Sequence, residues 1–252
     1  MTMILQKTLP YDPFAPKPLP GIMPLKSEDW LKQDDCAAAQ IDLRQRLIEE
    51  RAQDVLALAP AAMEAAQELL EHVAAQLFPG QDDVVSVSDG TSVQLDYCDP
   101  MRSLGRIAQQ DFCILQKPEG ADEHVLTGAV LCFPASWRLA DKFMRPLTQI
   151  HVPVPEYDAQ IAKRVQRLFD GVQVGRPLWR FNALWYDSAD LYHPDRDPVA
   201  PHLDRNQAGQ FLRSELQSIL RLPKTQAVVF SIHTRVLSRA DALAMSRVSA
   251  EG

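Results

Sequence analysis

The chain has 252 residues and a formal charge of −7, because 33 Asp and Glu residues outnumber 26 Lys and Arg residues. Its 46% apolar content excludes a mostly disordered chain and suits one or two globular domains. The acidic balance argues against a nucleic-acid backbone as the main partner, since that partner requires a field of Lys and Arg. No apolar run reaches the roughly 18 residues that span a bilayer.

The N-terminus shows no secretory signal, so we expect a cytoplasmic, reducing location. The four cysteines, Cys36, Cys98, Cys113 and Cys132, are widely spaced and form no C-x-x-C pair. This spacing gives no zinc or iron–sulfur motif. We expect thiols, with Cys113 and Cys132 buried in apolar runs, and a nucleophile or metal ligand as the alternative.

Repeated prolines predict an extended arm over residues 1–26, and we expect a single domain over residues 27–252. Apolar residues at helical spacing predict one helix over residues 40–58. A second helix should start at Pro60 and end before Pro79.

The middle of the chain carries strand signals. We expect a hairpin over residues 84–97, turning at Asp89-Gly90, and two strands over residues 111–117 and 124–133. An amphipathic helix should follow over residues 156–170, and an aromatic-rich strand over residues 177–186.

Near the C-terminus we expect a helix over residues 204–222, capped by Asp204 and stopped by Pro223. A strand over 227–236 and a helix over 238–248 complete the chain. Strands and helices do not alternate regularly, so we expect an α+β fold with an antiparallel sheet of about five or six strands and a helical N-terminal region. Neither common nucleotide-phosphate loop occurs.

His151 stands out because Pro153 and Pro155 follow it and stiffen the backbone. A stiff backbone suits an axial metal ligand or a positioned general base. The alternative is a hydrogen-bonded structural histidine. Arg138, Lys142 and Arg145 lie nearby in the sequence and suit a carboxylate or propionate.

The aromatic strand places Trp179, Phe181 and Trp185 on one face, with Arg180, Asn182 and Tyr186 on the other. We interpret it either as core with a solvated polar face or as the wall of a ligand pocket. Further along, we expect Glu215 and Gln217 in a helix. His233 and Arg235 should share one face of the last strand.

A possible metal site lies between His193 and Asp204, where two histidines, His193 and His202, and three aspartates occur in a proline-rich loop. Imidazole and carboxylate suit Zn or Fe. The alternative is a solvated surface loop.

Several ordered segments resemble the heme-dependent oxidative N-demethylase family, over about residues 20 to 237. The run Ile150-His151-x-Pro153-Val154-Pro155 is the most specific. The others are Pro24-Leu25, Asp29-Trp30-Leu31, Phe133-Pro134-x-x-Trp137 with Lys142 and Arg145-Pro146-Leu147, Arg180-x-Asn182, Leu191-Tyr192-x-Pro194, and the run from Arg221 to Ile232. The chain departs from the family at Met144, Ala183, Leu216 and His233, where Gly, Trp, Arg and Arg are common.

The resemblance implies a PAS-like domain that binds heme b and oxidatively demethylates small methylated amines. Electrons would come from separate reductase subunits that carry flavin and an iron–sulfur centre. His151 would be the axial metal ligand, and Glu215, Tyr186 and His233 are the catalytic candidates. The remaining cofactor-binding candidates are Trp137, Arg138, Lys142, Arg145, Arg180, Asn182 and Arg235. Two alternatives stay open: a non-catalytic heme or small-ligand binding module, and a non-heme metal hydrolase using His193 and His202.

Overall fold

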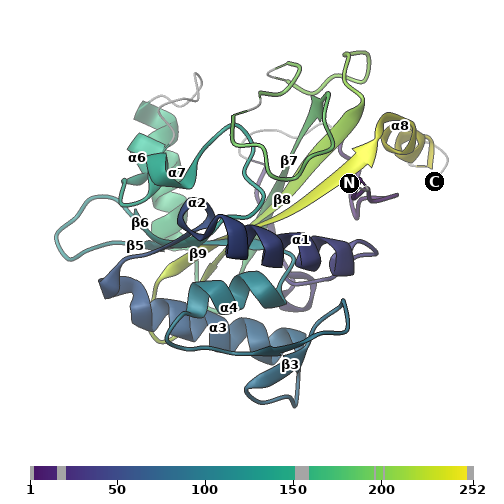
Figure 1. Ribbon diagram of the computed structural model, residues 1–252. Coiled ribbons are helices and arrows are strands. Elements are labelled where there is room, and N and C mark those ends of the chain that lie inside the picture. The colour runs from purple at the N-terminus through teal and green to yellow at the C-terminus, as the bar shows by residue number, and fades with distance from the viewer. Residues whose placement is uncertain (1–2, 16–20, 151–158, 196, 201, 249–252) are drawn as a thin grey trace.

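Seven antiparallel strands form one sheet in the computed structural model, which describes residues 3–15, 21–150, 159–195, 197–200 and 202–248 (Figure 1). The order across the sheet is β1-β7-β8-β9-β5-β6-β2. The strands are β1 Met23–Pro24, β2 Leu56–Leu58, β5 Asp111–Gln116, β6 Val125–Val130, β7 Leu178–Tyr186, β8 Phe211–Arg221 and β9 Val228–Ser238. A separate hairpin pairs β3 Val84–Ser86 with β4 Ser92–Gln94.

The helices gather on both sides of the sheet (Figure 1). They are α1 Ala37–Glu50, α2 Ala52–Val55, α3 Met63–Leu77, α4 Pro100–Ile107, α5 Leu139–Lys142, α6 Leu147–Ile150, α7 Ala159–Gly171 and α8 Arg239–Val248, with short 3-10 turns at Ser27–Asp29 and Pro60–Ala62. In the part of the chain that the structure describes, no helix combines the length and the apolar character needed to cross a membrane.

Cross-strand partners in an antiparallel sheet share a face, so the register defines two faces here. One face carries Cys113 and Ile219 and packs against Leu139 of α5, Leu147 of α6 and Phe169 of α7. The opposite face carries Phe112, Ile114 and Leu220, which pack in one cluster with apolar residues of α1, α3 and α4. Helices on both faces keep the central strands β8, β9 and β5 away from water.

The predicted α+β class and antiparallel sheet are confirmed. The sheet has seven strands rather than five or six because two short edge strands, β1 and β2, extend it. Leu56–Leu58 was expected inside a helix over residues 40–58. The prediction is wrong for these three residues: α1 ends at Glu50, α2 is helical over Ala52–Val55, and the chain then forms β2, which pairs with β6.

The helix predicted over residues 204–222 is wrong. Residues 211–221 form β8, which pairs along its whole length with β7 and β9. Asp204 does not cap a helix; its carboxylate accepts a hydrogen bond from the backbone N–H of Asn206 and so makes a turn. Helix α4, which Asp99 caps at its N-terminus, was not predicted from the sequence.

The described part of the proline-rich arm lies along the sheet. The Gln6 N–H donates to the carbonyl of Val236 in β9 at 2.9 Å. Tyr11 stacks on Phe181 of β7, with ring centroids 4.1 Å apart. Leu9 joins the same apolar cluster. The arm therefore covers the outer strands on the sheet face opposite α5–α7.

Candidate functional site

Polar side chains occupy part of the sheet face that α5–α7 cover elsewhere. The register pairs Arg180 of β7 with Gln217 of β8, and Asn182 with Glu215. Arg213, two residues before Glu215, shares this face. We call these five residues the polar face. They come from strands that are adjacent in the sheet but separated by a long loop in the sequence.

Glu215 is held from both sides along its own strand. Arg213 donates through Nε to Glu215 Oε1 at 3.3 Å, and Gln217 donates through Nε2 to Oε2 at 3.2 Å. These contacts fix the position of a carboxylate that remains partly exposed. The predicted position of Glu215 in a helix is corrected, yet its neighbours still orient it toward this face.

Arg213 was not among the site residues that we expected, although it makes the most contacts there. It is buried and donates to the carbonyl oxygens of Phe133 and Leu191, at 2.5 and 3.1 Å. It also donates to Nε2 of His193 at 3.3 Å. One guanidinium therefore ties two surface segments to the sheet and orients Glu215. In the sequence, Arg213 alternates with Glu215 and Gln217, and this period of two would have indicated that they share one face of a strand.

Two cations at this face, Lys142 and Arg180, make no ion pair with a carboxylate of the described residues. Lys142 Nζ lies 4.2 Å from the centre of the Trp137 ring. Burial lowers the pKa of Lys142 and of Arg180, while the negative charge of Glu215 acts in the opposite direction on both. Two partly desolvated cations thus face a single shared carboxylate.

Tyr186 closes the other end of the polar face. It lines a small cavity of about 10 Å³ together with Asn182, Leu184, Arg213 and Glu215. Burial raises the pKa of Tyr186, and a hydrogen bond with Ser136 and the charge of Arg213 work against that rise. The phenol therefore stays protonated at neutral pH and is a hydrogen-bond donor.

His151 lies outside the described residues. Its predecessor, Ile150, is the last residue of α6 and packs with Trp137 and Phe143 against the cluster that contains Leu139. The described chain before His151 therefore ends on the same face as Lys142 and Arg180. The role of His151 as a metal ligand stays a prediction.

Two predicted cofactor-binding arginines lie apart from the polar face. Arg138 makes a two-pronged ion pair with Asp195, with N–O distances of 2.8 and 2.7 Å. Arg145 is exposed, and its backbone carbonyl accepts a hydrogen bond from the backbone N–H of Leu126 in β6. Sequence proximity to Lys142 did not bring these side chains to the same place.

His233 and Arg235 share a face, as expected, but it is the face opposite Glu215. There Arg235 Nε donates to Asp34 at 3.0 Å, and His233 Nε2 lies 3.3 Å from the same carboxylate. Burial and the charge of Arg235 lower the pKa of His233 to about 4. Burial alone would raise the pKa of Asp34, but its contacts with His233 and Gln109 and the charge of Arg235 hold it well below the usual value.

Three of the four positions where the chain departs from the family pattern lie on the sheet face opposite the polar face. Leu216 and His233 are cross-strand partners on the face opposite the polar face, and Ala183 lies on that same opposite face. Met144 is exposed and has φ of 59°. This left-handed backbone favours glycine, which explains why the position suits Gly in the family.

The hypothesis of a metal site on His193 and His202 gains no support. His193 is buried and accepts a hydrogen bond from the Arg213 cation, which disfavours a metal ion there, and His202 is exposed. In the residues that the structure describes, the one group with ligand atoms close enough for a metal is Asp34, Asp35 and Cys36. Asp34 is already engaged by Arg235 and Gln109.

All four cysteines are free thiols, as expected. Burial, together with the charge of Asp111, raises the pKa of Cys113 to about 12. Burial also raises the pKa of Cys132 to about 12. Neither thiol forms a thiolate at neutral pH, so the nucleophile alternative is disfavoured.

Residues 21–249 match the family model described as "Haem-dependent oxidative N-demethylase, alpha subunit-like". The chain belongs to this family. The match spans the polar face, the Trp137–Lys142 segment and His151, so the resemblance noted in the sequence is confirmed at the level of the family. The description refers to proteins that are similar to the alpha subunit of a heme-dependent oxidative N-demethylase.

Heme is a flat apolar group with two carboxylate-bearing propionates, so its site needs cations and an apolar wall. The polar face offers Lys142 and Arg180, both partly buried and without an ion-pair partner among the described residues. Trp137, Phe143 and Ile150 supply half-buried apolar surface on the same side of the sheet. The residues present therefore fit the cofactor that the family description names.

Proposed function

We propose that this protein is the heme-binding subunit of an oxidative N-demethylase that acts on small methylated amines. The observation that carries the proposal is a pair of partly buried cations, Lys142 and Arg180, which lie on one sheet face and form no ion pair with a described residue. A partly buried cation without a counter-ion is costly, and an anionic cofactor removes that cost.

His151 would bind the iron of heme b, and Lys142 and Arg180 would bind its propionates. Arg138 and Arg235 are not assigned this role, because Arg138 lies apart from the polar face and Arg235 lies on the opposite face of the sheet. When bound, the heme supplies the redox-active iron at which dioxygen is reduced. A methyl group would leave as formaldehyde, one oxygen atom ending in formaldehyde and the other in water.

The chain's own residues would bind and orient the amine. Glu215, fixed between Arg213 and Gln217, presents a carboxylate to the ammonium group of the substrate. Tyr186 stays protonated and donates a hydrogen bond at the edge of the site. The two electrons would come from a separate reductase, for which the family resemblance implies flavin and an iron–sulfur centre; the lack of a nucleotide loop and of clustered cysteines in this sequence is consistent with such a partner.

Hemin titration of the purified protein tests this proposal. We expect a stoichiometric, sharpened Soret band. Lys142→Gln and Arg180→Gln should each weaken hemin binding about tenfold, since each removes one charge-assisted contact worth roughly 1.4 kcal/mol. His151→Ala should shift or abolish the band. Arg46→Gln, which removes an exposed arginine of α1, is the matched control and should bind hemin as the wild type does.

A folded protein that gives no stoichiometric Soret band would refute heme binding. Equal affinity in Lys142→Gln, Arg180→Gln and Arg46→Gln would refute the role of the two cations. Formaldehyde release from dimethylamine, with oxygen and a chemical reductant, then separates an enzyme from a non-catalytic heme-binding module.

A further inference from the structure

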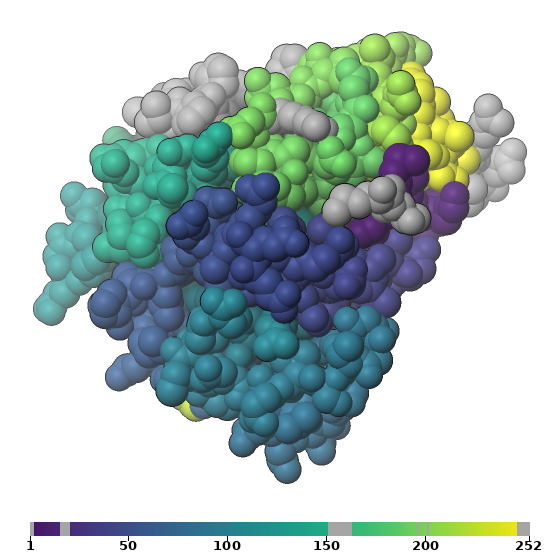
Figure 2. Space-filling view, in the orientation of Figure 1, coloured from purple at the N-terminus to yellow at the C-terminus, as the bar shows by residue number. Residues whose placement is uncertain are grey.

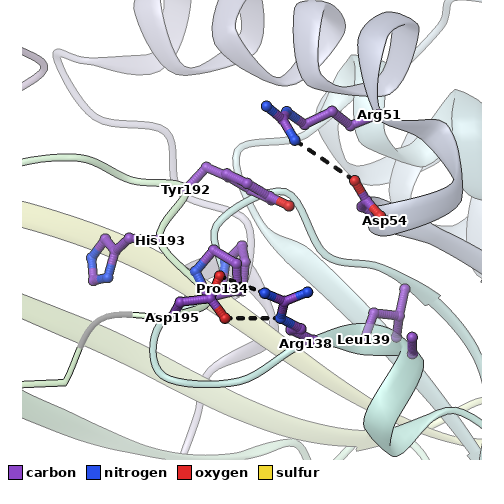
Figure 3. Close-up of a pocket in the computed structure, with 10 residues that line it drawn as sticks. Arg51, Asp54, Pro134, Arg138, Leu139, Tyr192, His193 and Asp195 are labelled. Carbon is purple, nitrogen blue, oxygen red and sulfur yellow. Dashed lines mark hydrogen bonds and ion pairs between the residues drawn. The ribbon is translucent and has the colours of Figure 1, made fainter.

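A second cavity lies away from the polar face and has a volume of about 350 Å³ (Figure 3). It is enclosed by α2, by the segment that follows Pro134 and by the segment around Tyr192. On the molecular surface, these segments meet where the dark-blue helices adjoin the teal and green regions (Figure 2). The volume falls within the range of small-molecule sites.

Opposite walls of this cavity carry opposite charges in pairs. Arg51 and Asp54 stand on one wall, 3.8 Å apart, and Arg138 and Asp195 form the two-pronged pair on the other (Figure 3). All four side chains are between 45% and 63% exposed. Exposed pairs contribute little to stability, typically about 0 to 1 kcal/mol, so a ligand can compete for them at low cost.

The wall formed by α2 still has hydrogen-bonding capacity. Within the described ranges, neither the side chain of Arg51 nor that of Asp54 makes a hydrogen bond, because their closest approach of 3.8 Å is too long. The Tyr192 ring lies under the Arg51 guanidinium, 5.4 Å from it, and its hydroxyl makes no hydrogen bond to a described residue. A guanidinium, a phenol and a carboxylate are thus all available together.

The charges of the lining balance, so the cavity does not select a simple anion or a simple cation. An anion placed against Arg51 lies close to Asp54, and a cation placed against Asp54 lies close to Arg51. A ligand that carries both charges satisfies both groups at once. Pro134, Leu139 and Pro194 line the rest of the cavity and suit a small apolar portion.

We propose that this cavity binds a small zwitterion of the amino-acid or betaine class. Its carboxylate would bind Arg51 and the Tyr192 hydroxyl, and its ammonium group would bind Asp54. The cavity and the polar face share no lining residue, although His193 of the cavity is hydrogen-bonded to Arg213 of the polar face. Binding in the cavity can therefore be tested without heme.

Titration calorimetry at low ionic strength, without added hemin, tests the proposal with three probes. N,N-Dimethylglycine carries both charges, while acetate and dimethylammonium carry one each. We expect dimethylglycine to bind at least tenfold more tightly than either single-charge probe. Arg51→Gln should weaken its binding at least tenfold, and Tyr192→Phe by a smaller factor. Arg46→Gln, which breaks an exposed Arg–Asp pair on α1 outside the cavity, should change nothing.

Either of two results would overturn the proposal. One is dimethylglycine binding no more tightly than acetate or dimethylammonium. The other is equal binding by Arg51→Gln and Arg46→Gln, with far-UV circular dichroism showing that both variants are folded. Neither result bears on the hemin titration, so this proposal and the proposed function can fail independently.

Discussion

Asp111 and Arg44 form a completely buried ion pair, and neutralising Asp111 should destabilise the protein severely. Both side chains have no exposed surface, and Arg44 Nη1 lies 2.6 Å from Asp111 Oδ1. The same carboxylate accepts the backbone N–H groups of Cys132 and Phe133, at 2.7 and 2.9 Å. It therefore satisfies three donors from two separate parts of the chain.

Asp111→Asn keeps the shape but removes the charge and one acceptor. The Arg44 guanidinium then stays buried without a counter-ion, although its Nε still donates to the carbonyl of Gly105 at 3.0 Å. Removing one partner of a buried ion pair costs roughly 3 to 5 kcal/mol. For a chain of this size each kcal/mol lowers Tm by about 2 to 4 °C, so Tm should fall by roughly 6 to 20 °C.

Urea unfolding at neutral pH, followed by far-UV circular dichroism and tryptophan fluorescence, measures this loss. Arg46→Gln is the matched control, since its pair with Asp42 is exposed and should cost less than about 1 kcal/mol. Arg44→Met combined with Asp111→Asn should cost less than the two single changes together, because no charge is left buried. A loss below about 1 kcal/mol for Asp111→Asn would show that the pair does not organise this core.

Three other outcomes are expected. His233 has a folded-state pKa of about 4, below its ordinary value, so it contributes stability that is complete above pH 6.5 and is lost as the pH falls toward 4. His233→Gln should therefore show a shallower loss of unfolding free energy over this window, by up to about 3 kcal/mol in urea titrations, and parallel curves would contradict this. Gly105→Ala should lower the free energy of unfolding by at least about 1 kcal/mol, because the added Cβ would lie 2.5 Å from Ile48 Cδ1. Gly171→Ala is the control, since its Cβ would meet nothing within 4 Å and should not destabilise the protein. Equal Tm values for the two variants would contradict this packing. Met144→Gly should raise the free energy of unfolding by roughly 0.5 to 1 kcal/mol, and with it Tm, because glycine adopts the left-handed backbone of this position without strain. A lower Tm would contradict the presence of that strain.

The β8 strand shows why part of the fold could not be predicted from the sequence. Leu212, Leu216 and Leu220 are spaced four residues apart, which fits one face of a helix and one face of a strand equally well. Leu, Glu, Gln and Arg are good helix formers, so local preference favoured the helix. Pairing with β7 and β9 over eleven residues decides the outcome, and that pairing is not encoded locally.

The sequence predicted several residues of the candidate site, but it did not predict how they are arranged in space. The alternation in β7 correctly separated Arg180, Asn182 and Tyr186 from the aromatic face. No local pattern could place Glu215 beside Asn182, because this contact depends on the register between two strands joined by a long loop. For the same reason, Asp34 as the partner of His233 and Arg235 was not foreseen.

The arm that lies along the sheet has a consequence for synthesis on the ribosome. Gln6 bonds Val236, and Tyr11 stacks on Phe181, so the arm can complete its contacts only after strands that come much later in the chain have been made. Contacts between such distant parts of a chain form slowly, so the arm is expected to dock late in folding, after the strands that it covers have paired.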